Sequence, residues 1–159
     1  MSTLVICDST SGTSAHSGSP ANSGTTEAIA EAIAIALGEG TAAVPVTGLG
    51  LDSLTGVEVL VIGSLSVGRR PSPNLKAFLS QLRPGTLRGV RAAAFDTRVR
   101  TVLHGDAARK ISRALEKGGA HVVAPPTGFI VAGREGRPAA GEVDRAAAWA
   151  GSIASVLRR

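Results

Sequence analysis

Cysteine and aromatic residues are scarce in this chain: its 159 residues include one cysteine, one tryptophan, three phenylalanines and no tyrosine. A single thiol forms no internal disulfide and completes no multi-cysteine zinc site, so disulfide scaffolds and zinc fingers are excluded. Long apolar runs are missing too, since those at 57–62 and 90–95 are interrupted by Glu58 and Arg91 and fall far below the ~20 residues that span a bilayer. The start, Met1-Ser2-Thr3, lacks the features of a signal peptide. We therefore expect a soluble, cytoplasmic protein without a membrane partner.

The chain is basic, with 17 lysines and arginines against 12 aspartates and glutamates and a formal net charge of +5. Net charge bears on partners and solubility rather than on the fold. Because fourteen of the seventeen cations are arginines, and arginine is abundant together with alanine and glycine, the placement of the charges is more informative than their sum.

Short apolar runs alternate with amphipathic stretches along the chain. Ile29 and Ile33 recur at helical spacing ahead of Gly38, which is typical of a helix with one buried stripe that ends at a glycine. Ser72 before Pro73 predicts another helix start, with the serine as N-cap. The predicted strands are 4–7, 41–46, 57–62, 90–95 and 122–131, the last interrupted by Pro125-Pro126, and the predicted helices are 29–37, 73–82, 106–117 and 141–157.

Strands that alternate with helices predict an open parallel sheet covered by helices on both faces. The near-continuous apolar run at 57–62 suits a central strand, whereas Pro45 places its strand at an edge. Cys7, at the end of the first strand, is expected to be a small buried residue rather than a reactive thiol. In the last helix, the pattern places these residues on the buried side: Val143, Ala147, Ala150 and Ile153.

Ligands of such a sheet bind beyond the carboxyl ends of the strands, where the strand order reverses. Three loops, 8–26, 64–73 and 96–105, are expected at that edge, and they are rich in serine, threonine, glycine and arginine. Hydroxyls, free backbone N–H groups and the positive end of a helix dipole together suit a phosphate group. The loops are therefore compatible with a phosphate-bearing ligand, although loops of this composition are common.

Five segments resemble the flavodoxin family: Ser9-Thr10-Ser11-Gly12-Thr13 and the stretches at 23–30, 63–68, 68–79 and 93–98. They follow the family's order and cover essentially the whole chain. The resemblance implies one domain over residues 1–159, an α/β flavodoxin-like three-layer sandwich whose five-stranded parallel sheet has the order 2-1-3-4-5. It also implies FMN as cofactor, with its phosphate in the first loop and its isoalloxazine ring beside the second.

The residues that the resemblance places around FMN come from all three loops. They are Ser9, Thr10, Ser11, Gly12, Thr13, Gly24, Thr25 and Thr26 in the first loop, Ser64, Leu65, Ser66, Val67 and Gly68 in the second, and Asp96, Thr97, Arg98 and His104 in the third. No catalytic residue and no metal ligand is implied, because the cofactor supplies the redox chemistry.

The first loop departs from the family pattern. Residues 14–22 separate its two parts, and this polar segment is expected to be an exposed loop. Two arrangements for the phosphate remain open: it is held by both parts together, through Ser9, Thr10, Thr25 and Thr26, or by the first turn alone.

The flavin-stacking aromatics of the family are also missing. Val67 stands where the family often has tryptophan, the loop at 96–105 has no aromatic residue, and Trp149 falls in the last helix. An isoalloxazine ring would then be held by backbone and aliphatic contacts.

The chain shares one feature with a serine-hydrolase site and one feature with a phospho-acceptor signalling site. Cys7-Asp8-Ser9 resembles a serine nucleophile that follows a strand, but no suitable Asp/His pair follows near the C-terminus. Asp8 also resembles part of a phospho-acceptor site, but Gly63 and Pro125 stand where that site needs an aspartate and a lysine. Isolated histidines make no metal site.

By resemblance, the expected function is electron transfer by bound FMN between a reductase and an acceptor. Two alternatives remain: a flavodoxin-fold binding or regulatory module that has lost FMN, and a small FMN-dependent quinone-type reductase. We expect a redox partner protein of acidic character, no nucleic-acid partner, and a monomer or weak dimer. The arginines that would form the partner patch are Arg69, Arg70, Arg98 and Arg100; in the alternative they are solvated or pair with Asp96 and Asp106.

Overall fold

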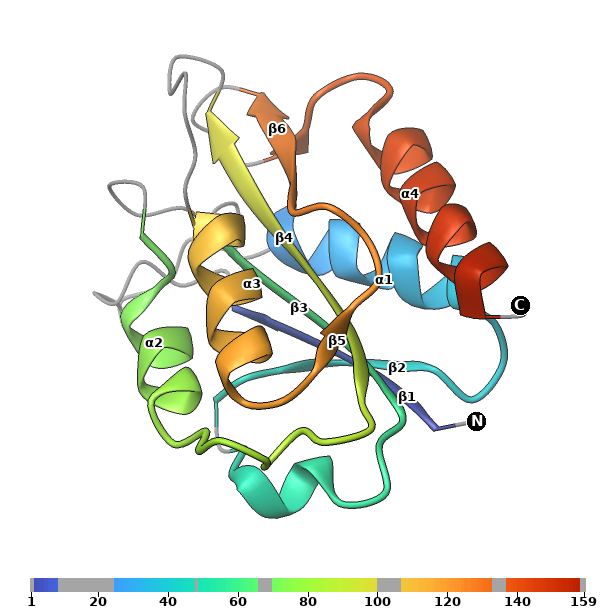
Figure 1. The fold of residues 1–159 in the computed structure, drawn as a ribbon. Coiled ribbons are helices and arrows are strands. Elements are labelled where there is room, and N and C mark those ends of the chain that lie inside the picture. The colour runs from blue at the N-terminus through green and yellow to red at the C-terminus, as the bar shows by residue number, and fades with distance from the viewer. Residues whose placement is uncertain are drawn as a thin grey trace.

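The computed structural model describes residues 2–8, 25–47, 49–65, 70–99, 107–132 and 137–157. In this part of the chain, one sheet lies between two layers of helices (Figure 1). The strands are β1 (Thr3–Asp8), β2 (Ala42–Pro45), β3 (Val59–Leu65), β4 (Arg91–Val99), β5 (His121–Val122), β6 (Thr127–Ala132) and β7 (Arg137–Pro138). The helices are α1 (Thr25–Leu37), α2 (Pro73–Leu79), α3 (Ala107–Lys117) and α4 (Glu142–Leu157), and a 3₁₀ helix, η2 (Leu51–Leu54), precedes β3.

The strand order is β2-β1-β3-β4-β6-β7, and β5 pairs with β4 ahead of β6. All of these pairs are parallel except β6 with β7, which is antiparallel. The predicted order 2-1-3-4-5 is confirmed, with the fifth strand divided into β5 and β6. Pro125 and Pro126 lie between the two parts, where a proline cannot donate a backbone hydrogen bond to a neighbouring strand. The antiparallel β7 was not predicted.

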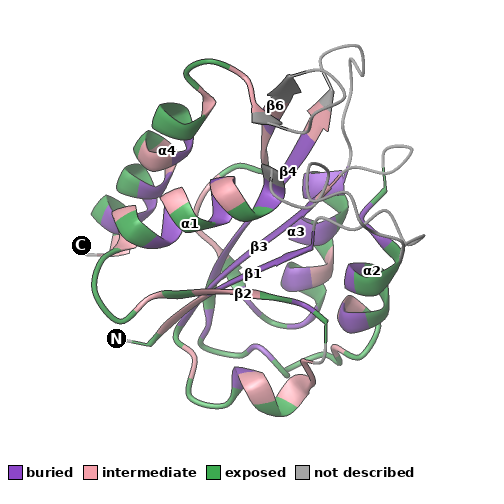
Figure 2. Cartoon of the chain, turned by 180° about the vertical axis from the view of Figure 1, so that it is seen from behind, coloured by how far each residue is buried: buried purple, intermediate pink, exposed green. Residues whose placement is uncertain are grey.

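Side chains of the central strands alternate between two hydrophobic cores, one on each face of the sheet. The first core, toward α2 and α3, includes Ile6, Ile62, Ala94, Leu75 and Ile111. The second, toward α1 and α4, includes Val5, Val61, Phe95, Ile29 and Ile153. Every residue of β3 from Val59 to Ser64 is buried (Figure 2), so the prediction of a central strand there is confirmed.

Two predicted helix boundaries are confirmed, and so are the residues that end or cap the helix at each of them. Gly38 follows α1 with a φ of 110°, a conformation that suits glycine and ends the helix. Ser72 is the N-cap of α2: its Oγ accepts a hydrogen bond from the backbone N–H of Leu75 at 3.3 Å, and Pro73 opens the helix. Local sequence signals therefore decide where these two elements begin and end.

The predicted buried stripe of α4 is partly wrong. Val143 is 43% exposed, and Ala147 is half-buried. The residues that face α1 and the sheet are Ala146, Ala150, Ile153 and Ala154. An alanine-rich helix gives a weak amphipathic pattern. Its rotation is set in the first turn, where Glu142 and Arg145 face β6, and this leaves Val143 outside the core.

All but one of the chain's four aromatic residues form a cluster in the second core. Phe95, Phe129 and Trp149 meet edge to face, with ring centroids 5.9–6.1 Å apart. The ring of Phe95 covers Gly63 on β3, where an added Cβ would lie 1.9 Å from the ring. The remaining aromatic, Phe78, is buried in the first core. No phenylalanine, tyrosine or tryptophan of this chain is therefore left to line a site at the carboxyl ends of the strands.

Candidate functional site

A row of three buried polar side chains crosses the carboxyl ends of the central strands. Asp8 of β1 is in register with Ser64 of β3, and Ser64 is in register with Asp96 of β4. All three are buried. They follow Ile6, Ile62 and Ala94 by two positions, so they point toward α2 and α3. Buried polar groups need partners, and the starts of these two helices provide them.

Asp8 and Ser64 are tied to the start of α2. The hydroxyl of Ser72 donates to Asp8 Oδ2 at 2.5 Å, while the backbone N–H of Ser72 donates to Ser64 Oγ at 2.8 Å. The Ser64 hydroxyl in turn donates to the carbonyl of Leu65 at 2.8 Å. These bonds hold the ends of β1 and β3 against the first residues of α2, so they fix the positions from which the first and second loops depart.

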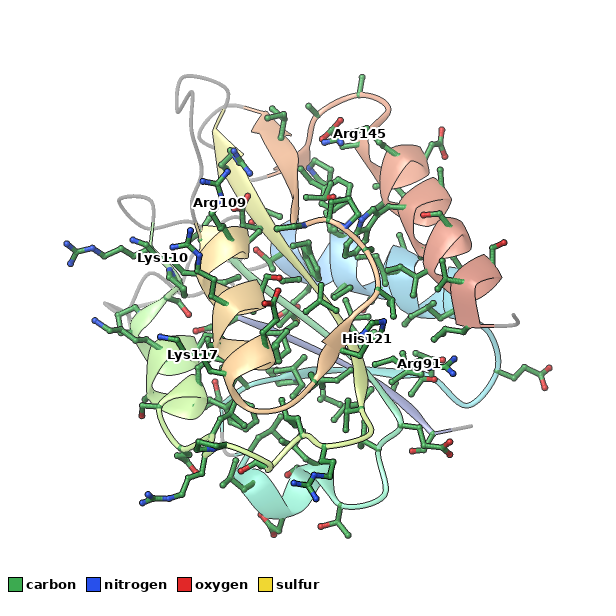
Figure 3. All side chains as sticks on the ribbon, viewed as in Figure 1. Arg91, Arg109, Lys110, Lys117, His121 and Arg145 are labelled. Carbon is green, nitrogen blue, oxygen red and sulfur yellow. The ribbon has the colours of Figure 1, made fainter. Side chains whose placement is uncertain are left out.

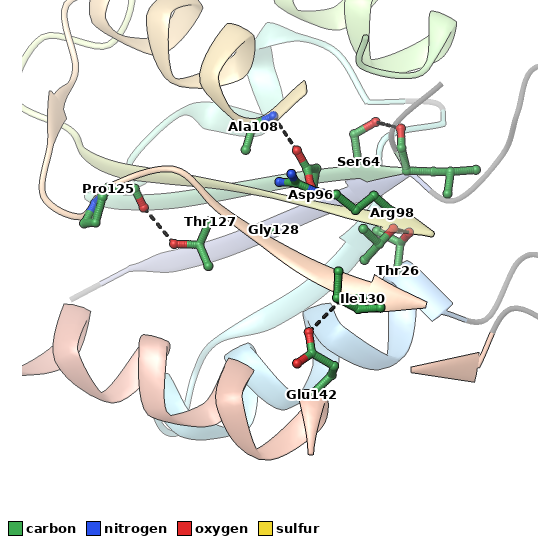
Figure 4. A network of polar contacts seen from close by, with 12 residues as sticks. Thr26, Ser64, Asp96, Arg98, Ala108, Pro125, Thr127, Gly128, Ile130 and Glu142 are labelled. Atoms are coloured by element: carbon green, nitrogen blue, oxygen red, sulfur yellow. Dashed lines mark hydrogen bonds and ion pairs between the residues drawn. The ribbon is translucent and has the colours of Figure 1, made fainter. Parts of the chain in front are cut away.

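Asp96 is tied to α3 and to Arg98. Its Oδ2 accepts the backbone N–H of Ala108 at 2.9 Å, and its Oδ1 accepts Nε and Nη2 of Arg98, each at 2.8 Å (Figure 4). A carboxylate at a helix N-terminus is favourable because it satisfies a free N–H and faces the positive end of the dipole. Asp96 therefore positions the start of α3 and neutralises Arg98.

The Arg98 guanidinium lies against Gly128 of β6. A Cβ on Gly128 would be 1.9 Å from Nη2 of Arg98, so a side chain at position 128 would require the guanidinium to move. The Arg98 side chain is only 17% exposed. Of the two alternatives for this arginine, the structure supports pairing with Asp96 rather than a free positive charge.

The opposite face of the same edge carries a pair of threonines. Thr97, which follows Asp96 in β4, lies with its Oγ1 2.7 Å from Oγ1 of Thr26 in the first turn of α1. Both side chains are fully buried. The pair joins the N-terminus of α1 to the end of β4.

The edge therefore gathers the N-termini of α1 and α3, with hydroxyls and amide dipoles, between the ends of β1, β3 and β4. Such an arrangement suits an anionic group. Within the described residues, no group of three or more histidine, cysteine, aspartate or glutamate side chains could hold a metal ion. No helix in the described part of the chain combines the length and apolarity needed to cross a membrane.

Comparison with solved structures finds the same architecture in flavodoxins. An archaeal flavodoxin superposes with a TM-score of 0.74 at 19% identity, covering 100% of both chains. Oxidised flavodoxin 2 from Bacillus cereus gives 0.75 at 19% identity and 100% of both chains, and flavodoxin 1 from the same organism gives 0.76 at 17% identity and 98% of both chains. The chain has the flavodoxin fold. No family model matches the sequence, and no curated protein shows significant similarity to it.

The flavodoxin fold also occurs as part of a longer chain. Rubredoxin oxygen:oxidoreductase from Desulfovibrio gigas matches 99% of this chain but only 36% of its own length, with a TM-score of 0.74 at 14% identity. The fold predicted from the resemblance is thus confirmed.

The structure describes part of the predicted site. Thr26 and Thr97 are brought into direct contact, and Ser64 and Asp96 occupy neighbouring strand positions. The side chains of Ser64 and Asp96 form hydrogen bonds within the protein, Ser64 with Leu65 and Ser72 and Asp96 with Arg98 and Ala108. These predicted residues and segments lie outside the described residues: Ser9, Thr10, Ser11, Gly12, Thr13, Gly24, Ser66, Val67, Gly68, His104, Arg69, Arg100 and the insertion at 14–22.

Three residues that organise this edge were missing from the sequence-based site. Asp8 and Ser72 carried usable signals, since one ends a strand and the other precedes a proline at a helix start. Gly128 carried none, because only the approach of Arg98 from a neighbouring strand shows why glycine is needed there.

Cys7 is a buried thiol, as predicted, with 3% of its surface exposed. Burial, the largest cause, and the negative charges of Glu27, Asp8 and Glu31 together raise its pKa to about 12. At neutral pH the thiol therefore stays protonated and unreactive, although it adjoins Asp8 at this edge.

Proposed function

We propose that this protein binds FMN at the carboxyl edge of its sheet and transfers electrons between partner proteins, as one domain over residues 1–159. The observation that carries the proposal is the superposition on flavodoxins over essentially the whole length of both chains. It is supported by the resemblance of the loop segments to that family.

The described residues fit a phosphate-bearing cofactor at α1. The helix begins at Thr25, directly at this edge, so its first backbone N–H groups and dipole face the first loop. Asp96 does not repel an anion at this edge. Arg98 neutralises its charge through Oδ1, and its Oδ2 accepts the backbone N–H of Ala108 in α3. The phosphate is assigned to Thr25 and Thr26 with Ser9–Thr13 and Gly24, and the ring to 64–68, 96–98 and His104.

Bound FMN supplies one- or two-electron redox chemistry, and the residues of this chain bind it, orient it and limit its exposure. Thr26 and Thr97 hold the phosphate-side helix against the strand that carries the third loop. Ser72, Asp8 and Ser64 hold the origin of the second loop. No aromatic side chain is available to stack on the ring, since all four are packed in the two cores.

The test is a titration of FMN with the purified apoprotein, followed by quenching of flavin fluorescence, with FAD as the matched control. We expect quenching with FMN and weaker or no quenching with FAD, because one helix N-terminus receives one phosphate. Thr26→Val, which removes a hydroxyl at that helix without changing side-chain shape, should weaken FMN binding. A protein that leaves FMN fluorescence unchanged would contradict the proposal and favour a module that has lost the cofactor.

A further inference from the structure

The helices on the two faces of the sheet carry opposite charge. All lysines and arginines of the chain lie at residue 69 or beyond, so α1 contains none of them. Helices α2 and α3 carry five cations and one anion, Glu116, whereas α1 and α4 carry four anions and one cation, Arg145. Arg145, the one cation within α1 and α4, is paired with Glu142. Among the four described helices, the positive charge is therefore concentrated on the face formed by α2 and α3.

Four of these cations form a stripe along α3. Arg109, Lys110, Arg113 and Lys117, which we call the α3 basic stripe, are all exposed, and Arg109, Arg113 and Lys117 follow one another at four-residue spacing. Figure 3 shows Arg109, Lys110 and Lys117 along α3. Within the described part of the chain, none of the four forms an ion pair. Like charges at this spacing destabilise a helix, so the repeat of Arg109, Arg113 and Lys117 does not serve helix stability, although the dipole favours Lys117 in the last turn.

The placement of two stripe residues adds to this conflict. Arg109 and Lys110 lie in the first turn of α3, which contains no acidic residue among those described, and the positive end of the helix dipole disfavours cations there. The carboxylate of Asp96 on β4 caps this turn by accepting the backbone N–H of Ala108. The stripe thus begins at the carboxyl edge, next to the candidate site, and runs away from it along α3.

We propose that the α3 basic stripe is the docking surface for an acidic protein partner, oriented so that the partner reaches the carboxyl edge of the sheet. The inference rests on the proposed electron-transfer function, which requires a partner close to this edge. Complementary charge supplies the attraction and accelerates encounter, and salt weakens it over a Debye length of about 8 Å at physiological ionic strength.

A protein partner fits better than a nucleic acid. Sequence-tolerant binding of single strands uses exposed aromatic side chains for base stacking, and the four aromatics of this chain pack in the two cores. The stripe also spans only nine residues of one helix, or about 12 Å from the first to the last, which matches a patch on a small protein and is short for a backbone-tracking groove.

The test maps binding on the isotope-labelled protein by NMR, with two small redox proteins of opposite charge as probes: an acidic iron–sulfur ferredoxin and a basic c-type cytochrome. At low salt, about 20 mM, we expect the ferredoxin to shift amide resonances along α3 and at the ends of β4 and β6, and the cytochrome to leave them unchanged. The variant Arg109→Glu/Arg113→Glu should weaken ferredoxin binding roughly tenfold. The matched control, Arg83→Glu/Arg88→Glu, changes net charge equally between α2 and β4 and should weaken it far less.

Three results would overturn the docking surface: shifts that map to α1 and α4, equal losses in both variants, or a short DNA duplex that displaces the ferredoxin at about 0.15 M salt. The readout uses resonances of the protein itself, so it works with or without cofactor. FMN titration of the same variants separates the two proposals. If the variants bind FMN normally but no longer bind the ferredoxin, the result supports the α3 basic stripe as the docking surface. If the protein binds no FMN at all, that result contradicts only the proposed cofactor function.

Discussion

The hydroxyl oxygens of Thr26 and Thr97 lie 2.7 Å apart, although 71 positions separate the two residues in the sequence. Neither side chain has exposed surface, so each hydroxyl depends on the other for a hydrogen bond that water cannot replace. The contact fastens the first turn of α1 to the end of β4, and with it the two loops assigned to opposite ends of the cofactor.

Replacing one threonine by valine should destabilise the protein more than replacing both. Thr97→Val leaves the Thr26 hydroxyl buried without this partner, at a cost of about 1–3 kcal/mol in the free energy of unfolding. In Thr26→Val/Thr97→Val both polar groups are gone, and part of that loss should return. Urea unfolding of the two single variants and the double variant measures the coupling. Simple addition of the two single losses would show that the hydroxyls do not interact.

Substitution by alanine should lower the free energy of unfolding by different amounts at Gly63 and Gly128, the two strand glycines covered by a neighbouring side chain. At Gly63 the obstacle is the Phe95 ring, fixed in the core, so Gly63→Ala should cost about 3 kcal/mol. At Gly128 the obstacle is the end of the flexible Arg98 side chain, which can move, so the cost should be about 1 kcal/mol.

Thermal unfolding of Gly63→Ala and Gly128→Ala measures both effects. The control is Gly128→Ala in an Arg98→Ala background, where the obstacle is absent and the added methyl should have little further effect. A full loss of stability in that background would mean that Arg98 is not what excludes a side chain at position 128.

Glu142 should protect one backbone amide at the edge of the sheet. Its Oε2 accepts the N–H of Ile130 at 2.6 Å, while Arg145, paired with Glu142, donates to the carbonyl of Gly128. Glu142→Ala should therefore accelerate hydrogen exchange at Ile130, whereas Glu142→Gln keeps an acceptor and should retain most of the protection. Equal exchange rates in the two variants would show that the side-chain oxygen does not protect this amide.

Stability should fall above pH 9 because of Cys7. Its pKa is about 12 in the folded protein against 9.0 for the free thiol, so the folded state holds a proton that the unfolded state releases. This contribution is complete below pH 9 and is lost toward pH 12, at about 1.4 kcal/mol per pH unit. Unfolding measured from pH 8 to pH 10.5, about half of that window, should show a steeper decline for the wild type than for Cys7→Ala. Parallel declines would assign the alkaline loss to other groups.

Local sequence signals were sufficient to predict most of the helices and strands and their order along the chain. Pro73 behind Ser72 opens α2, Gly38 ends α1, and the apolar run of β3 is fully buried. Each of these signals acts within a few residues, through a cap, a left-handed backbone conformation or a run of apolar side chains, and so it can be read without knowing what lies across the sheet. With strands alternating with helices, the right-handed crossover rule leaves few possible topologies.

The tertiary structure alone decided which polar side chains meet. Thr26 of α1 meets Thr97 of β4, and the Arg98 side chain covers Gly128, because helix packing and strand register bring α1, β4 and β6 together at this edge. The alanine-rich α4 was rotated by contacts of its first turn with β6, and this moved Val143 out of the core. The sequence determined the elements, because their signals are local; the structure decided the contacts between them, because these depend on strand register and helix rotation, which only long-range packing fixes.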